Sequence, residues 1–337
     1  MTDDYFDPDL EKIVEYFHRI WESAILVAAL ELDLFTELHD APRSAKDIAD
    51  SLSIDEKGVR ILLDALCPEG FVRKQGNRYH LTHISAKYLN RKSEHYPGPI
   101  HWGAANPAKW TALGRLADAV RAGKPIVEPS GDPGEFYRKL TQAIAYTSSS
   151  TVPQLAQHLG IGIEDKKGWS ILDVACGTGD YGRKLLEYDG TAQLTLSDLP
   201  PVLDQARTSI SDEHLLERIN WLPGNIFEVE YPRETYDLIL LSHFLHSNPV
   251  HACQDIIARL AAANKKGGYF VVHEFVPDEN RCERRFPLLF AMNMYINNEG
   301  DAYTYEEIRS WMEGAGYTDA EFVDTRGRSS FVIGTKV

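Results

Sequence analysis

A short glycine motif, Gly177-Thr178-Gly179, stands between an apolar run at 171–176 and a segment of helical periodicity at 181–188. Glycine lets the backbone approach a ligand closely, and the first turn of a helix offers free N–H groups. A tight turn without a ligand would also explain the glycines. Asp198, however, comes 19 positions after Gly179, close to the separation of about 20 at which an acid binds the ribose in dinucleotide folds. This spacing favours a ribose-binding site.

The elements that must position this motif alternate from about residue 161 onward. Apolar strand candidates recur, with helical segments between the earlier ones, at 171–176, 194–196, 219–222, 238–242, 269–273, 320–323 and 331–337. Strands that alternate with helices indicate a parallel, doubly wound sheet. The last two candidates predict an antiparallel hairpin at one edge. The predicted fold class is therefore α/β, with a mostly parallel seven-stranded sheet at 161–337.

The first 105 residues predict a separate, mainly helical domain. Ser44 and Asp47 have the spacing of a capping box, and Asp55 begins a further apolar helix. Residues 71–82 alternate around a Gly-Asn turn, which predicts two short strands. Helix, helix and hairpin is the order of a winged helix. Residues 106–160 are predicted to be a helical linker, interrupted by a loop at 125–134.

A winged helix could bind DNA by placing its second helix in the major groove. That helix carries only Lys57 and Arg60 as cations, beside Asp55, Glu56 and Asp64. The alternative is a packing or dimerisation domain. Apolar residues early in the chain favour it, because they offer more surface than one helix face can bury internally. We therefore predict a homodimer.

The chain resembles a known enzyme family over nearly its whole length. The motif that runs from Asp173 to Gly179 resembles the first motif of class I S-adenosylmethionine (SAM) methyltransferases, and the segments 223–227, 240–247 and 267–274 resemble the ends of that family's later strands. With the segments 28–35 and 60–66, the match narrows to small-molecule O-methyltransferases that bear a winged-helix dimerisation domain. This family includes plant phenolic, acetylserotonin and bacterial tailoring enzymes, and residues 303–317 resemble the bacterial branch.

The resemblance implies a Rossmann-like SAM-binding domain and a reaction that releases S-adenosylhomocysteine (SAH). Methyl transfer needs chiefly an aligned nucleophile and the management of one proton. We expect the acceptor to be a hydroxyl of a small aromatic or polyketide-like metabolite. The cofactor-binding residues that follow from the resemblance and the glycine motif are Asp173, Gly177, Gly179, Asp198, Leu199, Asn225, Ile226, Ser242 and His243.

His246 is the candidate general base, because it follows the fourth predicted strand, at the carboxyl edge where open α/β sheets bind ligands. It also matches the family's catalytic histidine. Glu274 ends the fifth strand and matches the glutamate that orients this histidine. A polar histidine at the start of a helix is the alternative without chemistry. For the apolar helix at 286–295, core packing and a wall of the acceptor pocket remain equally open, and the resemblance implies that Phe290, Asn293 and Met294 line the pocket.

Two departures from the plant pattern affect the predicted chemistry. Ser247 replaces the usual aspartate after the histidine, and Asp301 or Ala302 falls where a second glutamate is usual. C-methylation and a non-methylating reaction of bound SAM therefore remain alternatives. A winged-helix regulator that senses SAM is the alternative from another class of protein.

Histidine is a common metal ligand, and four occur close together in the sequence or at strand ends: His243, His246, His251 and His273. No cysteine or HExxH context accompanies them, so no metal is predicted. The four cysteines lie far apart and predict reduced, mostly buried thiols.

Composition excludes several other classes of protein. With 35 basic and 50 acidic residues the formal charge is −15, which disfavours nucleic acid and anionic membranes as partners. The start of the chain has no signal-peptide pattern, and no stretch approaches the roughly 20 apolar residues that span a bilayer. We expect a cytoplasmic protein of about two domains.

Overall fold

The computed structural model describes residues 7–127, 133–144, 148–163 and 165–337. Contacts divide the chain into two compact units, 1–105 and 106–337. The contacts of the predicted helical linker, 106–160, thus make it part of the second unit. Part of the loop predicted at 125–134 lies outside the described residues. Within the described residues, no helix has both the length and the hydropathy that crossing a bilayer requires.

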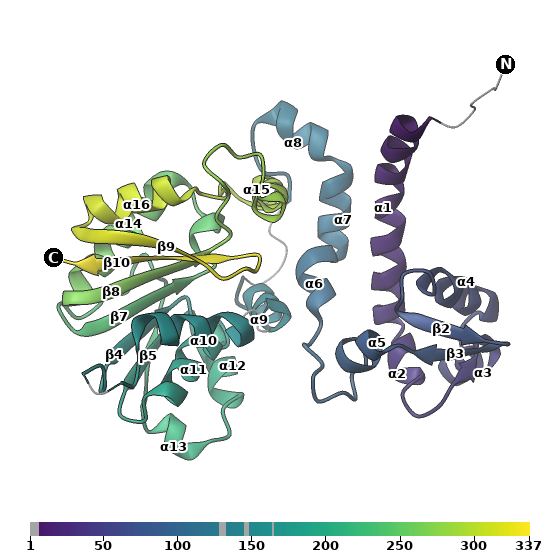
Figure 1. Cartoon of the computed structure of the whole chain (residues 1–337), viewed down its shortest axis with the longest axis horizontal. Coiled ribbons are helices and arrows are strands. Elements are labelled where there is room, and N and C mark those ends of the chain that lie inside the picture. Colours follow the sequence, from purple (N-terminus) through teal and green to yellow (C-terminus); the bar gives the residue numbers. More distant parts are fainter. Residues whose placement is uncertain (1–6, 128–132, 145–147, 164) are drawn as a thin grey trace. The chain divides into compact units, whose positions relative to one another are not determined.

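The amino-terminal unit is a set of helices around a small antiparallel sheet (Figure 1). The elements in chain order are α1 (Pro8–Glu31), α2 (Leu34–Glu37), β1 (Arg43–Ser44), α3 (Ala45–Leu52), α4 (Glu56–Leu66), β2 (Val72–Gln75), β3 (Arg78–Leu81), α5 (His83–Tyr88) and α6 (Ile100–Ala105). The predicted capping box is confirmed, since Ser44 and Asp47 exchange side-chain and backbone hydrogen bonds at the start of α3. The predicted hairpin is also present, and β1 pairs with β3.

Helix α1 is buried only at its carboxyl-terminal end. Ala29 and Leu30 belong to the core of this unit, whereas the first half of the helix exposes large apolar side chains. Phe17, Ile20 and Trp21 are 71%, 56% and 60% exposed. An apolar face of this size on a single helix is typical of a surface that binds another protein.

The second unit contains a seven-stranded sheet in the order β6-β5-β4-β7-β8-β10-β9. Its strands are β4 (Ser170–Val174), β5 (Gln193–Asp198), β6 (Ile219–Pro223), β7 (Tyr236–Ser242), β8 (Asn264–Glu274), β9 (Tyr317–Asp324) and β10 (Ser330–Lys336). In this order, the five strands β6, β5, β4, β7 and β8 are parallel to one another. Strand β10 is antiparallel to both β8 and β9. The predicted α/β class and the mostly parallel seven-stranded sheet are confirmed.

Helices cover both faces of this sheet (Figure 1). The helices of this unit are α7 (Pro107–Gly114), α8 (Leu116–Ala122), α9 (Pro133–Ile144), α10 (Ser148–Leu159), α11 (Asp180–Tyr188), α12 (Pro200–Thr208), α13 (Glu213–Leu216), α14 (Val250–Ala263), α15 (Arg285–Asn297) and α16 (Tyr305–Gly314), of which α10 and α11 pack on one face of the sheet and α14 and α16 on the other. Successive strand residues alternate between two cores. In β7, Leu238 and Leu240 pack with α10 and α11, whereas Ile239 and Leu241 pack with α14 and α16.

Two sequence predictions need adjustment. Strand β4 ends at Val174 rather than Cys176, because Ala175 takes a left-handed conformation with φ of 52° and turns the chain. The four cysteines are free, but only Cys176 and Cys253 are buried; Cys67 is half-buried and Cys282 is exposed.

Candidate active site

The glycine motif forms a left-handed turn between β4 and α11. Gly177 and Gly179 have φ values of 58° and 72°, which favour glycine. A Cβ on Gly179 would also lie 2.8 Å from Leu196 Cδ1 on β5. The backbone N–H of Gly177 donates to Asp198 Oδ2 at 2.8 Å, and that of Leu199 donates to Oδ1 at 2.7 Å. The structure therefore brings the motif and the predicted ribose-binding acid into direct contact.

Burial raises the pKa of the Asp198 carboxyl to about 6, against the opposing effect of its two backbone hydrogen bonds. Each carboxylate oxygen has two acceptor sites, so each retains one beyond its backbone donor. The turn after β6 joins this group, since the N–H of Gly224 donates to the backbone oxygen of Asp198 at 3.0 Å. Asn225 and Ile226 lie in that turn, and Asn225 Oδ1 accepts from the N–H of Phe227 at 3.1 Å.

Asp173 lies beneath the motif rather than at its surface. Its Oδ2 accepts from the N–H of Gly182 in α11 at 2.9 Å, and the residue is 1% exposed. Burial raises the pKa of this carboxyl to about 8. A Cβ on Gly182 would lie 2.6 Å from Leu194 Cδ1, so this glycine lets α11 pack against β5. The glycine spacing alone did not identify that role.

A histidine and a glutamate pair at the carboxyl edge of the sheet. Nδ1 of His246, in the 3-10 turn η2 (Leu245–Ser247), lies 2.7 Å from Glu274 Oε2 at the end of β8. The backbone N–H of His246 donates to Oε1 at 3.2 Å, and that of Phe275 donates to Oε2 at 3.2 Å. Burial alone would raise the pKa of Glu274, but the charge of His246 and its hydrogen bonds outweigh burial and hold that pKa below its usual value.

His243 contributes a second imidazole beside this pair. Its φ of 53° is unusual for a residue with a side chain, and its ring centroid lies 6.2 Å from that of His246 and 4.6 Å from that of His273. Both ring nitrogens are shielded from solvent and have no hydrogen-bond partner among the described residues, and the same is true of Ser242 Oγ. Burial lowers the pKa of His243 to about 4, so the ring is neutral at pH 7.

In the described part of the chain, His243, His246 and Glu274 are a group whose ligand atoms, within 4.8 Å of one another, could hold a metal ion. Glu274 accepts three hydrogen bonds, one on Oε1 and two on Oε2, so its pairing with His246 is explained without an ion. His273 is engaged elsewhere, with Nε2 at 2.7 Å from Ser329 Oγ. His251 lies in the first turn of α14 and is exposed.

Aromatic side chains surround the His246 ring on one side. Its centroid lies 4.9 Å from that of Phe290 and 5.6 Å from that of Phe275. Phe286 lies 5.0 Å from Phe275, which completes a wall of three phenylalanines, Phe275, Phe286 and Phe290. The sequence predictions did not name Phe275, although it directly follows Glu274, and they included Phe286 only as the first residue of the apolar helix at 286–295.

The other predicted acceptor residues lie further along α15. Met294 is buried, and its sulfur receives a long contact of 3.9 Å from Ser247 Oγ. Asn293 accepts from Asn297 Nδ2 within its own helix at 3.1 Å. Where the resemblance places a second glutamate, Ala302 offers only a methyl group, and the carboxylate of Asp301 lies 3.6 Å from the Arg281 guanidinium.

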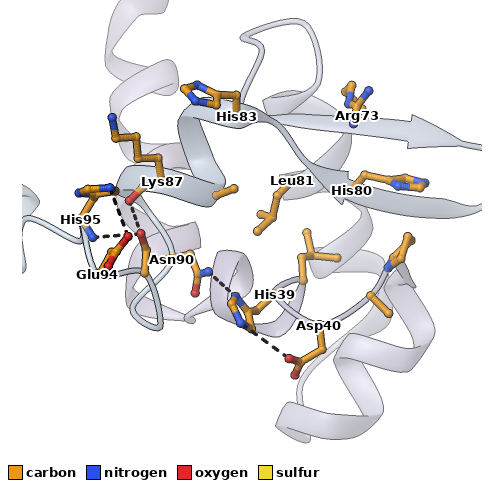
Figure 2. Close-up of a pocket in the computed structure, with 15 residues that line it drawn as sticks. His39, Asp40, Arg73, His80, Leu81, His83, Lys87, Asn90, Glu94 and His95 are labelled. Carbon is orange, nitrogen blue, oxygen red and sulfur yellow. Dashed lines mark hydrogen bonds and ion pairs between the residues drawn. The ribbon is translucent and has the colours of Figure 1, made fainter.

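A separate hollow of about 790 Å³ lies in the amino-terminal unit (Figure 2). Arg73, Lys87 and four histidines line it together with Asp40 and Glu94. Asn90 Nδ2 lies 2.6 Å from His39 Nδ1 at its base. None of the residues that the sequence predicts for binding or catalysis lines this hollow.

Comparison with known proteins identifies the family. Residues 136–318, more than half of the chain, match the O-methyltransferase domain, and residues 14–91 match the O-methyltransferase dimerisation domain. The chain is 25% identical to the tetracenomycin polyketide synthesis 8-O-methyl transferase TcmO of Streptomyces glaucescens, over 96% of each chain. It is 28% identical to the 3-hydroxy-5-methyl-1-naphthoate 3-O-methyltransferase of Streptomyces sahachiroi, over 94% of this chain and 92% of the relative.

Human N-acetylserotonin methyltransferase, solved in complex with SAM, has the same fold, with a TM-score of 0.86 and 22% identity over 99% of both chains. The fold, the glycine motif with its acid, and the match to both family domains lead to one assignment. The chain belongs to the O-methyltransferase family and is a SAM-dependent methyltransferase.

Proposed function

We propose that the enzyme methylates a hydroxyl of a small aromatic or polyketide-like acceptor, with His246 as the general base. The observation that carries this proposal is the contact of 2.7 Å between His246 Nδ1 and Glu274 Oε2 at the carboxyl edge of the sheet. A carboxylate on Nδ1 fixes the tautomer and leaves Nε2 as the acceptor of a proton. When bound, SAM would supply an electrophilic methyl group.

The residues at and around the glycine motif fit the nucleoside part of SAM. Gly177 and Gly179 let the backbone approach a ligand, and Asp198 keeps acceptor sites for two ribose hydroxyls. Leu199 continues the chain beside this acid, and Asn225 and Ile226 border it in the turn after β6. Ser242 and His243 hold buried polar atoms without partners, as expected where a ligand completes the hydrogen bonding. Asp173 supports the motif from below through Gly182.

The pair of His246 in η2 and Glu274 at the end of β8 can carry out the proton transfer. The acceptor hydroxyl gives its proton to Nε2 of His246 as its oxygen attacks, and the imidazolium that forms is stabilised by the ionised Glu274. The wall of three phenylalanines presents apolar ring faces beside the base, which suits a planar aromatic acceptor. The two Streptomyces relatives are named for polyketide and naphthoate acceptors, which supports the same class.

The decisive experiment compares single-turnover rates of wild type and His246→Ala with the true acceptor from pH 6 to 9. We expect a loss of roughly a hundred- to ten-thousand-fold in the methyl-transfer rate, because base catalysis acts in the transition state. SAH affinity should be unchanged, and Glu274→Gln should cause a smaller loss. A near-wild-type rate across that range would refute the general base and point to a carbon nucleophile or an ionised phenol.

We further propose a homodimer through α1. The exposed side chains of Phe17, Ile20 and Trp21 lie within the matched dimerisation domain, and burying them against a second copy removes a large apolar area from water. Light scattering at micromolar concentration should give twice the chain mass of 38.0 kDa. A double substitution, Phe17→Glu with Trp21→Glu, should yield the monomer mass. A monomer mass for wild type would contradict the proposal.

A further inference from the structure

We infer that Gly300 is a positioning residue for His246, which it holds through a close contact between backbones. The inference rests on the proposed function of His246. Gly300 is buried, and a Cβ at this position would lie 1.8 Å from the backbone oxygen of His246 and 2.8 Å from the carbonyl carbon of Ser247. Both atoms belong to the backbone, so no side-chain rotation can make room.

Space, rather than backbone conformation, is what requires glycine here. The φ of Gly300 lies outside the left-handed region, so this angle does not by itself require glycine. An added methyl group would therefore act by displacement: either η2 or the segment 298–303 has to move. Because His246 lies in η2, a movement of η2 would shift the imidazole relative to the acceptor.

Hydrogen bonds to several parts of the unit hold the segment 298–303 in place, which opposes its displacement. The N–H of Gly300 donates to Asn298 Oδ1 at 2.9 Å, and the N–H of Asn298 donates to the backbone oxygen of Met294 in α15 at 2.8 Å. Further along, Arg281 donates to the backbone oxygen of Ala302 at 2.8 Å. Tyr303 donates its hydroxyl to the backbone oxygen of Asn248, directly after η2.

The turn η2 is held on its other sides as well. Cys253 Sγ donates to the backbone oxygen of Leu245 at 3.3 Å, and Asn248 Nδ2 donates to that of Phe244 at 2.9 Å. Glu274 holds the His246 N–H. Of the two residues that fall where the family has a second glutamate, Ala302 has no polar side chain, and the carboxylate of Asp301 lies 3.6 Å from the Arg281 guanidinium. Glu274 and these hydrogen bonds of η2 therefore hold His246, and the close approach of Gly300 limits the turn on the remaining side.

The first test is Gly300→Ala with Gly314→Ala as the matched control. A Cβ on Gly314, the last residue of α16, would meet no heavy atom within 4 Å. We expect Gly300→Ala to lower kcat on the order of ten- to a hundred-fold, since misplacement of a reacting group by about 1 Å can cost a hundred-fold. KM for the acceptor should change less than threefold and SAH affinity less than twofold, on the order expected for an intact binding site. Gly314→Ala should match wild type.

A second readout follows the imidazole itself. In protein labelled with ¹⁵N-histidine, the Nδ1 signal of His246, assigned by its loss in His246→Ala, should shift in Gly300→Ala and stay in place in Gly314→Ala. Because this signal does not depend on turnover, it tests positioning even if His246→Ala proves to be active and the proposed function fails. A wild-type kcat together with an unmoved signal in Gly300→Ala would overturn the inference.

A double variant tests whether Gly300 acts through the histidine. His246→Ala with Gly300→Ala should be no slower than His246→Ala alone, and a further loss would contradict the inference. If Gly300→Ala fails to bind SAH, Arg281→Gln replaces it as the test, because it releases the backbone of Ala302 without adding volume at η2. In Arg281→Gln, a loss in kcat smaller than that expected for Gly300→Ala, together with a shifted His246 Nδ1 signal, supports the inference. A wild-type kcat and an unshifted signal in this variant overturn it.

Discussion

The two halves of the candidate site are built in opposite ways. At the glycine motif, Asp198 receives backbone donors on both oxygens; Asp173 beneath it receives one from α11 on Oδ2, and its buried Oδ1 has no partner among the described residues. Next to His246, the ring nitrogens of His243 and the hydroxyl of Ser242 are buried without partners among the described residues. Hydrogen bonds already hold the Asp198 carboxylate in place, whereas Ser242 and His243 leave polar atoms for a ligand to satisfy. Substitution of Asp198 should therefore affect mainly cofactor binding, and substitution of His246 mainly methyl transfer.

Of the substitutions that distinguish the two halves of the site, the one at Asp198 should have the largest effect, on cofactor affinity. Asp198→Ala removes a charged acceptor from the ribose hydroxyls and should weaken SAH binding by about 1.5 to 3 kcal/mol. Calorimetry of SAH binding measures the effect, and the rate of methyl transfer at saturating SAM should fall much less. Unchanged SAH affinity would show that the cofactor does not bind at this acid.

A smaller effect follows from the raised pKa of Asp198, about 6. The ionised carboxylate is the better acceptor, so SAH affinity should be highest above pH 7 and should fall as the pH drops through 6. At pH 5 about one molecule in ten keeps the carboxylate, which limits the loss to about tenfold. Calorimetry from pH 5 to 8 tests this, with Asp198→Asn as the variant whose profile should be flat. If SAH affinity fell with pH in Asp198→Asn as it does in wild type, a group other than Asp198 would be responsible.

The smallest predicted effect concerns the acceptor. Phe286→Ala should raise the acceptor KM by about three- to tenfold through lost apolar contact, with SAH affinity unchanged. Leu289→Ala is the control on the same helix, because Leu289 is exposed and should leave KM as in wild type. An equal effect of both substitutions would indicate a general disturbance of α15 and would break the separation of the two halves.

Sequence patterns predicted one half of the site better than the other, for a physical reason. The glycine motif and Asp198 end adjacent parallel strands, so spacing along the chain is enough to place them together. The positions of His246 and Glu274 could be predicted in the same way, because they lie at the carboxyl ends of the adjacent parallel strands β7 and β8. The roles that we propose for Gly300 and Phe286 depend on how a later loop and helix pack against η2 and β8, and no local periodicity encodes such contacts. The left-handed backbone at Ala175, which ends β4 early, left no local signal either.

The buried carboxyl of Asp173 makes folding a proton-uptake reaction. With a pKa of about 8 in the folded chain, against an ordinary value of 3.8, this group carries a proton at pH 7 after folding and none before it. Its contribution to the free energy of unfolding is present in full below pH 3.8 and is lost as the pH rises through 8. The turn that we propose to hold the cofactor thus lies above a neutral acid at pH 7, and a pH above 8 would place a charge beneath it.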